Sequence, residues 1–193
     1  MSSLKSRTNP AAAVAVSLFA LASAASATVV CSSGGPIAVP ATTAGVYVNL
    51  VTGTSATTPA ASPGWDINPW GTGGVFFYFN NAADSSPAGA VATGGIIDVL
   101  SAGATIGSAS AYSVVAPSVA QLANWRTTQT GKYLGVRFWN EATLAINYGW
   151  MRIDTVSATT GLPSTIQSWC YQNDGTAIDA STMPVELQSF SVE

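Results

Sequence analysis

Residues 131–154 carry the pattern that most constrains the fold of this chain. Within them, apolar side chains alternate with Tyr, Gly, Arg and Trp, so that Leu134, Val136 and Phe138 share one face of an extended strand. A turn at 140–142 then reverses the chain, and a second apolar run follows. The pattern predicts a β-hairpin with one face buried in a hydrophobic core.

Most of the remaining sequence consists of short β-branched or aromatic runs separated by turns rich in Gly, Pro, Ser and Asn. The most apolar run, 75–79, is expected to be a central strand buried on both faces. Residues 52–63 and 80–89 have the composition of loops, and 117–125 is the single segment with helical spacing. Further strands are predicted at 46–51, 95–100, 104–106, 111–115, 165–171 and 185–192.

About eight to ten short strands with at most one short helix predict an all-β fold, a single antiparallel β-sandwich of jelly-roll type. The sequence lacks the regular alternation of helix and strand that a parallel sheet needs. It also lacks an internal repeat of fixed period, which argues against a propeller or a solenoid. We therefore expect one core between two sheets.

Residues 1–27 have the composition of a secretory signal peptide. A start with one Lys and one Arg precedes an apolar stretch at 11–24, and Ala-Ser-Ala at 25–27 fits a cleavage site. The apolar stretch is shorter than the roughly 20 residues of a membrane-spanning helix, which favours cleavage over the alternative, a retained N-terminal anchor. We expect a β-sandwich domain at 28–193 without a membrane span, exported to the periplasm, the cell surface or the extracellular medium.

Charge is scarce in this chain: six Lys and Arg, nine Asp and Glu and no His give a net charge of −3. Two of the cations lie in the predicted signal peptide, and the others are scattered along the domain. Such a chain lacks the basic patch that binds phosphate backbones or anionic lipid, so we expect no nucleic-acid partner and no membrane-surface partner. Weak charge repulsion between molecules makes self-association a candidate property.

The domain contains two cysteines, Cys31 and Cys170, which are 139 positions apart. In an oxidising compartment an even pair indicates a disulfide, which here would tie the N-terminal segment to the penultimate strand. Closing so long a loop stabilises a fold by about 4–5 kcal/mol in the chain-entropy treatment. The alternative is a reactive thiol or a metal-binding pair, but the chain has neither histidine nor Cys-x-x-Cys spacing to support it.

The absence of histidine removes Ser-His-Asp and Cys-His nucleophiles and the usual zinc sites. The glycines at 71–74 lack the helix and lysine that follow a phosphate-binding loop. Paired carboxylates remain as the one general acid–base option, with Asp66, Asp98 and Glu141 as candidates for a glycoside hydrolase. Most acidic residues lie at turns, where carboxylates are usually solvated, so we expect a protein that is not an enzyme.

Six tryptophans suggest sugar binding, because an indole face can stack on the apolar face of a pyranose. Trp65 and Trp70 flank Asp66 and Asn68, whose side-chain oxygens are suited to hydrogen-bond a sugar hydroxyl or to ligate calcium. Calcium needs about six to eight oxygen ligands and only these two are identifiable, so no cofactor is expected. The alternative is that the two tryptophans fill the core.

A second candidate surface lies on the hairpin, on the face opposite its apolar side chains. Tyr133, Arg137 and Trp139 share that face, where a planar cation between two aromatic rings suits binding to a sugar or to a partner strand. The alternative is that loops cover both faces of the sandwich.

The hairpin also carries a resemblance to a known group. Residues 133–138 (YLGVRF) and 147–150 (NYGW) resemble the Y-L-G-[FV]-R-F … Y-G-W core of many secreted bacterial proteins, including proteins with the PEP-CTERM sorting signal that exosortase reads. The resemblance implies an exported β-sandwich of extracellular or envelope location, in a group mostly without assigned activity. This chain departs from the sorted members, since its last residues contain no Pro-Glu-Pro motif, apolar helix or Arg cluster.

These observations lead to three functional hypotheses. The first is a non-enzymatic exported protein that binds a glycan or belongs to an extracellular matrix. The second is a structural subunit that self-assembles into a layer or filament through exposed strand edges. The third is the carboxylate-dependent hydrolase. Export, the strands rich in Trp and Tyr and the missing catalytic groups favour the first.

Overall fold

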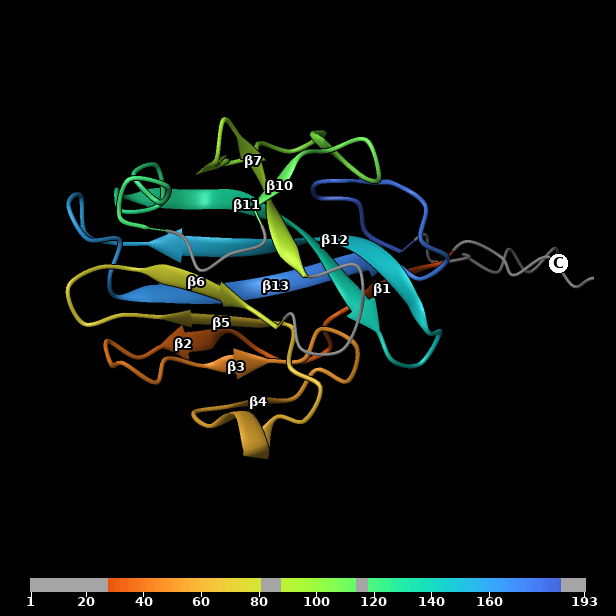
Figure 1. Ribbon diagram of the computed structural model, residues 1–193, viewed down its shortest axis with the longest axis horizontal. Helices are drawn as coiled ribbons and strands as arrows, with labels where there is room; N and C mark the ends of the chain where they lie inside the picture. Colours follow the sequence, from red (N-terminus) through yellow and green to blue (C-terminus); the bar gives the residue numbers. More distant parts are fainter. Residues whose placement is uncertain (1–27, 81–87, 114–117, 185–193) are drawn as a thin grey trace, which may run out of the picture.

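The computed structural model describes residues 28–80, 88–113 and 118–184, which form three antiparallel sheets (Figure 1). The predicted signal peptide at 1–27 and the predicted strand at 185–192 lie outside the described residues. The prediction of an all-β fold of antiparallel sheets is confirmed.

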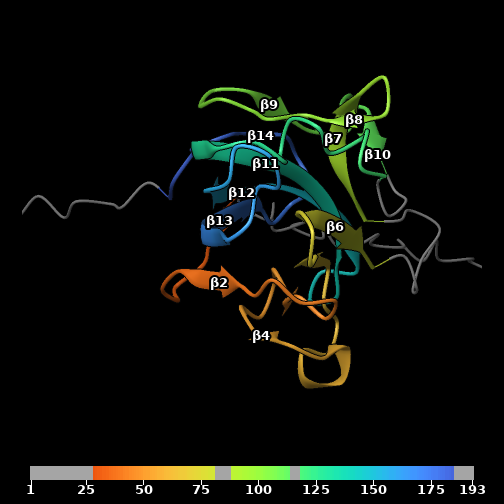
Figure 2. The ribbon, with the colours of Figure 1, turned by 90° about the vertical axis from the view of Figure 1, so that its left-hand side faces the viewer.

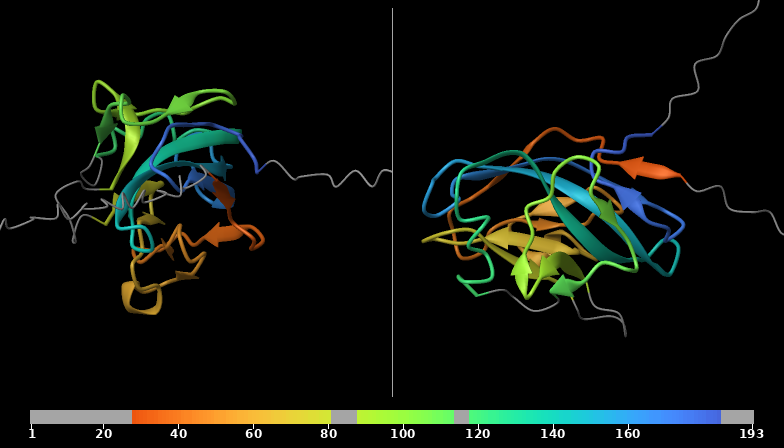
Figure 3. Two further views of the ribbon diagram at one scale, coloured as in Figure 1. Left: turned by 90° about the vertical axis from the view of Figure 1, so that its right-hand side faces the viewer. Right: turned by 90° about the horizontal axis from the view of Figure 1, so that it is seen from above.

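The large sheet forms the middle of the molecule. Six of its eight strands follow the order β1-β13-β12-β11-β7-β10, while β2 also pairs with β13 and β8 with β7 (Figure 3). Its strands are β1 (Val29–Cys31), β2 (Ile37–Val39), β7 (Gly89–Thr93), β8 (Ile96–Ile97), β10 (Tyr112–Ser113), β11 (Gln129–Asn140), β12 (Ala145–Thr155) and β13 (Ser164–Gln172).

The small sheet, in the order β4-β3-β5-β6, packs against one face of the large sheet (Figure 2). Its strands are β3 (Tyr47–Val48), β4 (Ser55–Ala56), β5 (Ile67–Trp70) and β6 (Phe76–Phe79). Side chains of both sheets fill the main core, among them Ile67 and Phe77 of the small sheet and Met151 and Ile153 of the large one. Two sheets packed face to face over a shared core make a β-sandwich.

The predicted hairpin is confirmed as β11 and β12, which pair along almost their whole length. Leu134, Val136 and Phe138 are all buried in the main core, as their alternation predicted. Asn140 fixes the turn between the two strands, because its Oδ1 accepts the N–H of Ala142 at 2.9 Å.

A third, two-stranded layer covers part of the other face of the large sheet (Figure 2). Its strands are β9 (Thr105–Ile106) and β14 (Ile178–Asp179). Ile106 and Ile178 from this layer meet Trp150 and Cys170 of the large sheet in a second, smaller core. The middle of the large sheet is therefore buried on both faces.

Residues 75–79 were expected to form a central strand buried on both faces, and this prediction is wrong. They contain β6, which lies at the edge of the small sheet. Phe77 and Phe79 are buried in the main core, whereas Tyr78 between them is 45 % exposed. Phe and Tyr occur on the buried and on the exposed face of a strand. In an unbroken apolar run the alternation between buried and exposed positions is therefore not visible in the sequence.

The segment predicted as a helix, 117–125, forms separate turns over its described residues. Leu122 and Trp125 are buried, as their helical spacing predicted, but Val119, expected on the same face, is 55 % exposed. Two buried side chains hold the segment against the core without a regular helix. The one helical element of the described residues is a short 3-10 helix, η1 (Pro59–Ala61), inside a predicted loop.

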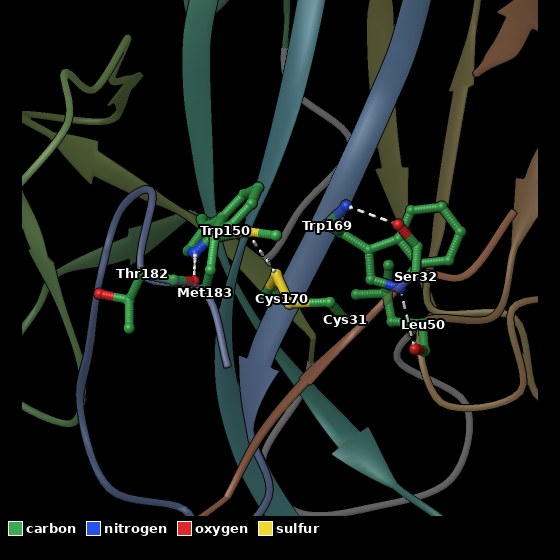
Figure 4. The surroundings of a disulfide bond; sticks show 8 residues. All are labelled: Cys31, Ser32, Leu50, Trp150, Trp169, Cys170, Thr182 and Met183. Carbon is green, nitrogen blue, oxygen red and sulfur yellow. Dashed lines mark hydrogen bonds between the residues drawn. A yellow bond between two sulfur atoms is a disulfide. The ribbon is translucent and has the colours of Figure 1, made fainter. Parts of the chain in front are cut away.

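Cys31 and Cys170 form the predicted disulfide and lie directly opposite each other in the register of β1 and β13 (Figure 4). Hydrogen bonds continue this attachment beyond the disulfide, since Ser32 N–H donates to the carbonyl of Trp169 at 2.9 Å. The indole N–H of Trp169 donates in turn to the carbonyl of Leu50 at 3.0 Å, which links β13 to the segment after β3 (Figure 4).

Candidate functional site

The outward face of the small sheet carries a row of aromatic side chains. In β6, Phe77 and Phe79 are buried in the main core, whereas Phe76 and Tyr78 alternate with them toward the opposite face. Phe76 is partly buried and also packs against the core. The antiparallel register places Trp70 of β5 opposite Phe76. We name this set the aromatic face, and it comprises Tyr47, Trp65, Trp70, Phe76 and Tyr78.

Ring contacts arrange the aromatic face in two groups. Trp65 stacks on Tyr78 with ring centroids 5.8 Å apart and planes inclined by 29°, and Tyr47 meets Trp65 edge-on at 5.0 Å. Trp70 stacks on Phe76 at 4.9 Å, with planes inclined by 23°. Each ring restrains its neighbour, so the orientation of the face is set before a ligand arrives. Tyr78 is exposed, and the other four rings are half-buried.

Arg126 adds a cation beside the Trp70–Phe76 group. Its Cζ lies 5.0 Å from the centroid of the Phe76 ring, and its Nη2 donates to the carbonyl of Gly73 at 2.7 Å. A Cβ on Gly74 would overlap the guanidinium, so the turn beside β6 needs a glycine at this position. The guanidinium is thus held by an aromatic ring on one side and by backbone on the other.

The two tryptophans and the asparagine predicted as sugar-binding residues are placed differently. Trp65 and Trp70 both belong to the aromatic face, whereas Asn68 between them is buried. Nδ2 of Asn68 donates to the carbonyl of Ala44 at 2.8 Å. Asn68 therefore holds the loop before β3 in place, and the rings on either side of it offer the accessible surface.

Asp66 lies in a buried joint between the small sheet and the turn of the β11–β12 hairpin. Its Oδ2 accepts the N–H of Leu50 at 2.7 Å, and the residue is only 5 % exposed. Asn49, next to Leu50, donates through Nδ2 to Oε1 of Glu141 at 2.6 Å. Burial raises the pKa of Asp66 well above its ordinary value, and the charge of Glu141 raises it further, against the opposing hydrogen bond from Leu50.

We expect the wild type to lose stability as pH rises from about 4 toward neutrality. The Asp66→Asn variant should lack this loss. Above the ordinary pKa of an aspartate, Asp66 has released its proton in the unfolded chain but keeps it in the folded protein. Rising pH therefore stabilises the unfolded state relative to the folded state. One such proton changes the free energy of unfolding by at most about 1.4 kcal/mol per pH unit. Urea unfolding at a series of pH values measures the slope.

Asp174→Asn is the matched control for that experiment. The hydrogen bonds from Thr176 lower the pKa of Asp174, which lies on the surface, so this carboxylate contributes with the opposite sign. Removing the Asp174 carboxylate should make the slope of the free energy of unfolding against pH more negative or leave it unchanged. A wild-type slope that survives in Asp66→Asn contradicts the assignment to Asp66.

The three carboxylates considered for a hydrolase do not form one group, because Asp98 belongs to a different part of the fold from Asp66 and Glu141. Asp98 follows β8 at the large sheet and accepts a hydrogen bond from the hydroxyl of Thr93 at 2.9 Å. Asp66 and Glu141 are neighbours, but Asp66 is enclosed. Within the described ranges, no three His, Cys, Asp or Glu side chains gather as metal ligands.

The second predicted surface, on the hairpin, is partly covered by neighbouring elements. Tyr133 packs edge-on against Trp150 with ring centroids 5.3 Å apart, at the second core. Arg137 lies over the ring of Tyr112, with its Cζ 4.7 Å from the centroid. Trp139 is half-buried near the hairpin turn. The structure thus pairs the Arg137 guanidinium with Tyr112 of β10, a residue that the sequence pattern did not connect with the hairpin.

Four residues of this site are not among the candidates that the sequence pattern indicates: Tyr47, Phe76, Tyr78 and Arg126. The aromatic composition of 75–79 was a usable signal, since one residue in two of such a run faces outward in an edge strand. Arg126 has no local signal, because its ring partner lies 50 positions earlier in the chain.

Comparison with known protein families, with curated proteins and with solved structures finds no match to this chain. The resemblance of the hairpin to secreted bacterial proteins therefore stays a prediction. Over the described part of the chain, no helix is long and apolar enough to cross a membrane.

Proposed function

We propose that this protein is an exported, non-enzymatic carbohydrate-binding protein and that the aromatic face binds the glycan. The observation that carries the proposal is the stacked Trp65–Tyr78 pair on the outward face of the small sheet, with Tyr78 45 % exposed. An aromatic ring offers the C–H face of a pyranose an apolar surface. Because neighbouring rings already restrain these side chains, binding costs little conformational entropy.

Other features of the chain support this proposal. The Cys31–Cys170 disulfide fits an oxidising compartment, as does the composition of the first 27 residues. Because Asp66 is enclosed and the chain lacks histidine, few side chains are available as the general acid or base of a hydrolase. Self-assembly into an extracellular layer stays a prediction, for which the edge position of β6 is the relevant feature.

Tyr78→Ala should weaken glycan binding about tenfold or more, which corresponds to about 1.4 kcal/mol of lost stacking. A glycan array of plant, bacterial and self-derived exopolysaccharides identifies the ligand with the wild-type protein. Isothermal titration then compares the dissociation constants of wild type and variant.

Trp139→Ala is the control, because Trp139 is a half-buried aromatic residue on the other candidate surface. We expect its dissociation constant to match that of the wild type. Weakened binding in Trp139→Ala with unchanged binding in Tyr78→Ala would move the site to the hairpin. Silence across the whole array would remove the carbohydrate-binding proposal.

A further inference from the structure

Arg126 places a positive charge at one end of the aromatic face. The guanidinium stacks on Phe76, which itself stacks on Trp70, so cation and rings form one continuous group. Phe76 and Tyr78 are two residues apart on the same face of β6, which separates their Cα atoms by roughly 7 Å. The charge and both ring groups are therefore close enough to contact neighbouring sugar units of one chain.

The charge of Arg126 has no counter-charge in the described structure. Nη2 uses the carbonyl of Gly73, but Nη1 is buried without any hydrogen-bond acceptor, and no described carboxylate forms an ion pair with the side chain. Lys132, by comparison, is exposed enough to be solvated and also bonds the hydroxyl of Ser101. A guanidinium donor left without an acceptor is costly, and an arriving anion relieves that cost.

We infer that the glycan bound by the aromatic face is acidic, and that Arg126 binds its carboxylate. This inference rests on the proposed function. A uronic-acid unit combines a pyranose ring, which can pack against the aromatic face, with a carboxylate, which accepts two N–H groups from one planar guanidinium. Nη1 is reached only if the glycine turn at 71–74 shifts away from the guanidinium. Gly73 in this turn has open space around its Cβ position, whereas Gly74 lies directly against Arg126.

The net charge of the chain does not oppose this inference strongly. The whole chain carries −3, and residues 28–193, with four Lys and Arg against nine Asp and Glu, carry −5. Charges farther away than the Debye length of about 8 Å at physiological salt are largely screened. A carboxylate in contact with Arg126 is well inside that distance. Local charge complementarity therefore outweighs the weak long-range repulsion.

The test compares polygalacturonate with its carboxyl-reduced, neutral derivative. Affinity electrophoresis or isothermal titration is carried out with the purified protein in the presence of EDTA, which removes calcium bridges between carboxylates. We expect the acidic polymer to bind at least about tenfold more tightly, and this advantage to shrink as salt is raised. Arg126→Gln should abolish the advantage, so that the acidic and the neutral polymer bind this variant equally.

Arg126→Lys and Arg152→Gln complete the set of variants. Arg126→Lys keeps the charge without the planar fork and should retain part of the preference. Arg152 is an exposed arginine of β12 on the large sheet, so Arg152→Gln removes the same charge elsewhere and should leave the preference intact. Circular dichroism and thermal unfolding establish that each variant is folded, and the wild-type comparison of the two polymers needs no variant.

The outcomes separate the two proposals. Equal binding of both polymers by the wild type overturns the acidic ligand and leaves the carbohydrate-binding function standing. A full preference in Arg126→Gln, or an equal loss in Arg152→Gln, overturns the role of Arg126. Binding to neither polymer, together with a silent glycan array, overturns both proposals.

Discussion

Replacing both cysteines, Cys31→Ser with Cys170→Ser, is expected to lower the free energy of unfolding by about 4–5 kcal/mol. The disulfide closes a segment with a sequence separation of 139, and the entropy that it removes from the unfolded chain grows with that length. Since a domain of this size is stable by only about 5–15 kcal/mol, the loss is a large fraction of the total. Urea unfolding followed by tryptophan fluorescence measures it.

The folded state should also change locally at β1. This strand has three residues, and β13 is its one partner among the described strands, so without the disulfide few contacts hold it in place. We expect faster hydrogen exchange at the N–H of Ser32, which bonds the carbonyl of Trp169.

A reducing agent provides the matched control for the disulfide. It should bring the wild type to the stability of the double variant and leave the double variant itself unchanged. An unfolding midpoint that does not respond to the substitutions would show that the disulfide contributes nothing to stability. It would also remove the chain-entropy argument for this protein.

The hairpin was predictable because its signals are local. The alternation of Leu134, Val136 and Phe138 and the turn residue Asn140 lie within one short stretch, and the outcome depends mainly on that stretch. What covers its second face was not predictable in the same way. β9 and β14 have two residues each and pair across more than seventy positions of sequence, with no local pattern that links them.

The aromatic face was predictable only in part. Trp65 and Trp70 lie in one segment and were identified together, while Tyr47 and Tyr78 come from other strands. Their meeting depends on the register of β3, β5 and β6, which the core side chains of the whole small sheet determine. Asp66 was expected to be accessible to a ligand, but in the folded protein it is buried beside the turn of the β11–β12 hairpin.

Trp125→Ala is expected to destabilise the fold by about 3–5 kcal/mol, the usual range for removing a fully buried indole. Trp125 is 0 % exposed and meets Phe77 of the small sheet edge-on, with ring centroids 5.6 Å apart. Its indole N–H donates to the carbonyl of Asp98, beside the large sheet, at 3.0 Å. One side chain from an irregular segment thus links both layers of the sandwich.

Two comparisons separate packing from other effects of that substitution. Trp125→Phe keeps an aromatic ring but loses the hydrogen bond to Asp98, so it should cost less than the alanine variant. Val119→Ala changes an exposed residue of the same segment and should shift the free energy of unfolding by less than about 0.5 kcal/mol. Denaturant unfolding of the three variants gives the values. An equally small loss in the free energy of unfolding for Trp125→Ala and Val119→Ala would mean that this segment can detach while the core stays packed. The two sheets would then hold together without the link through Trp125.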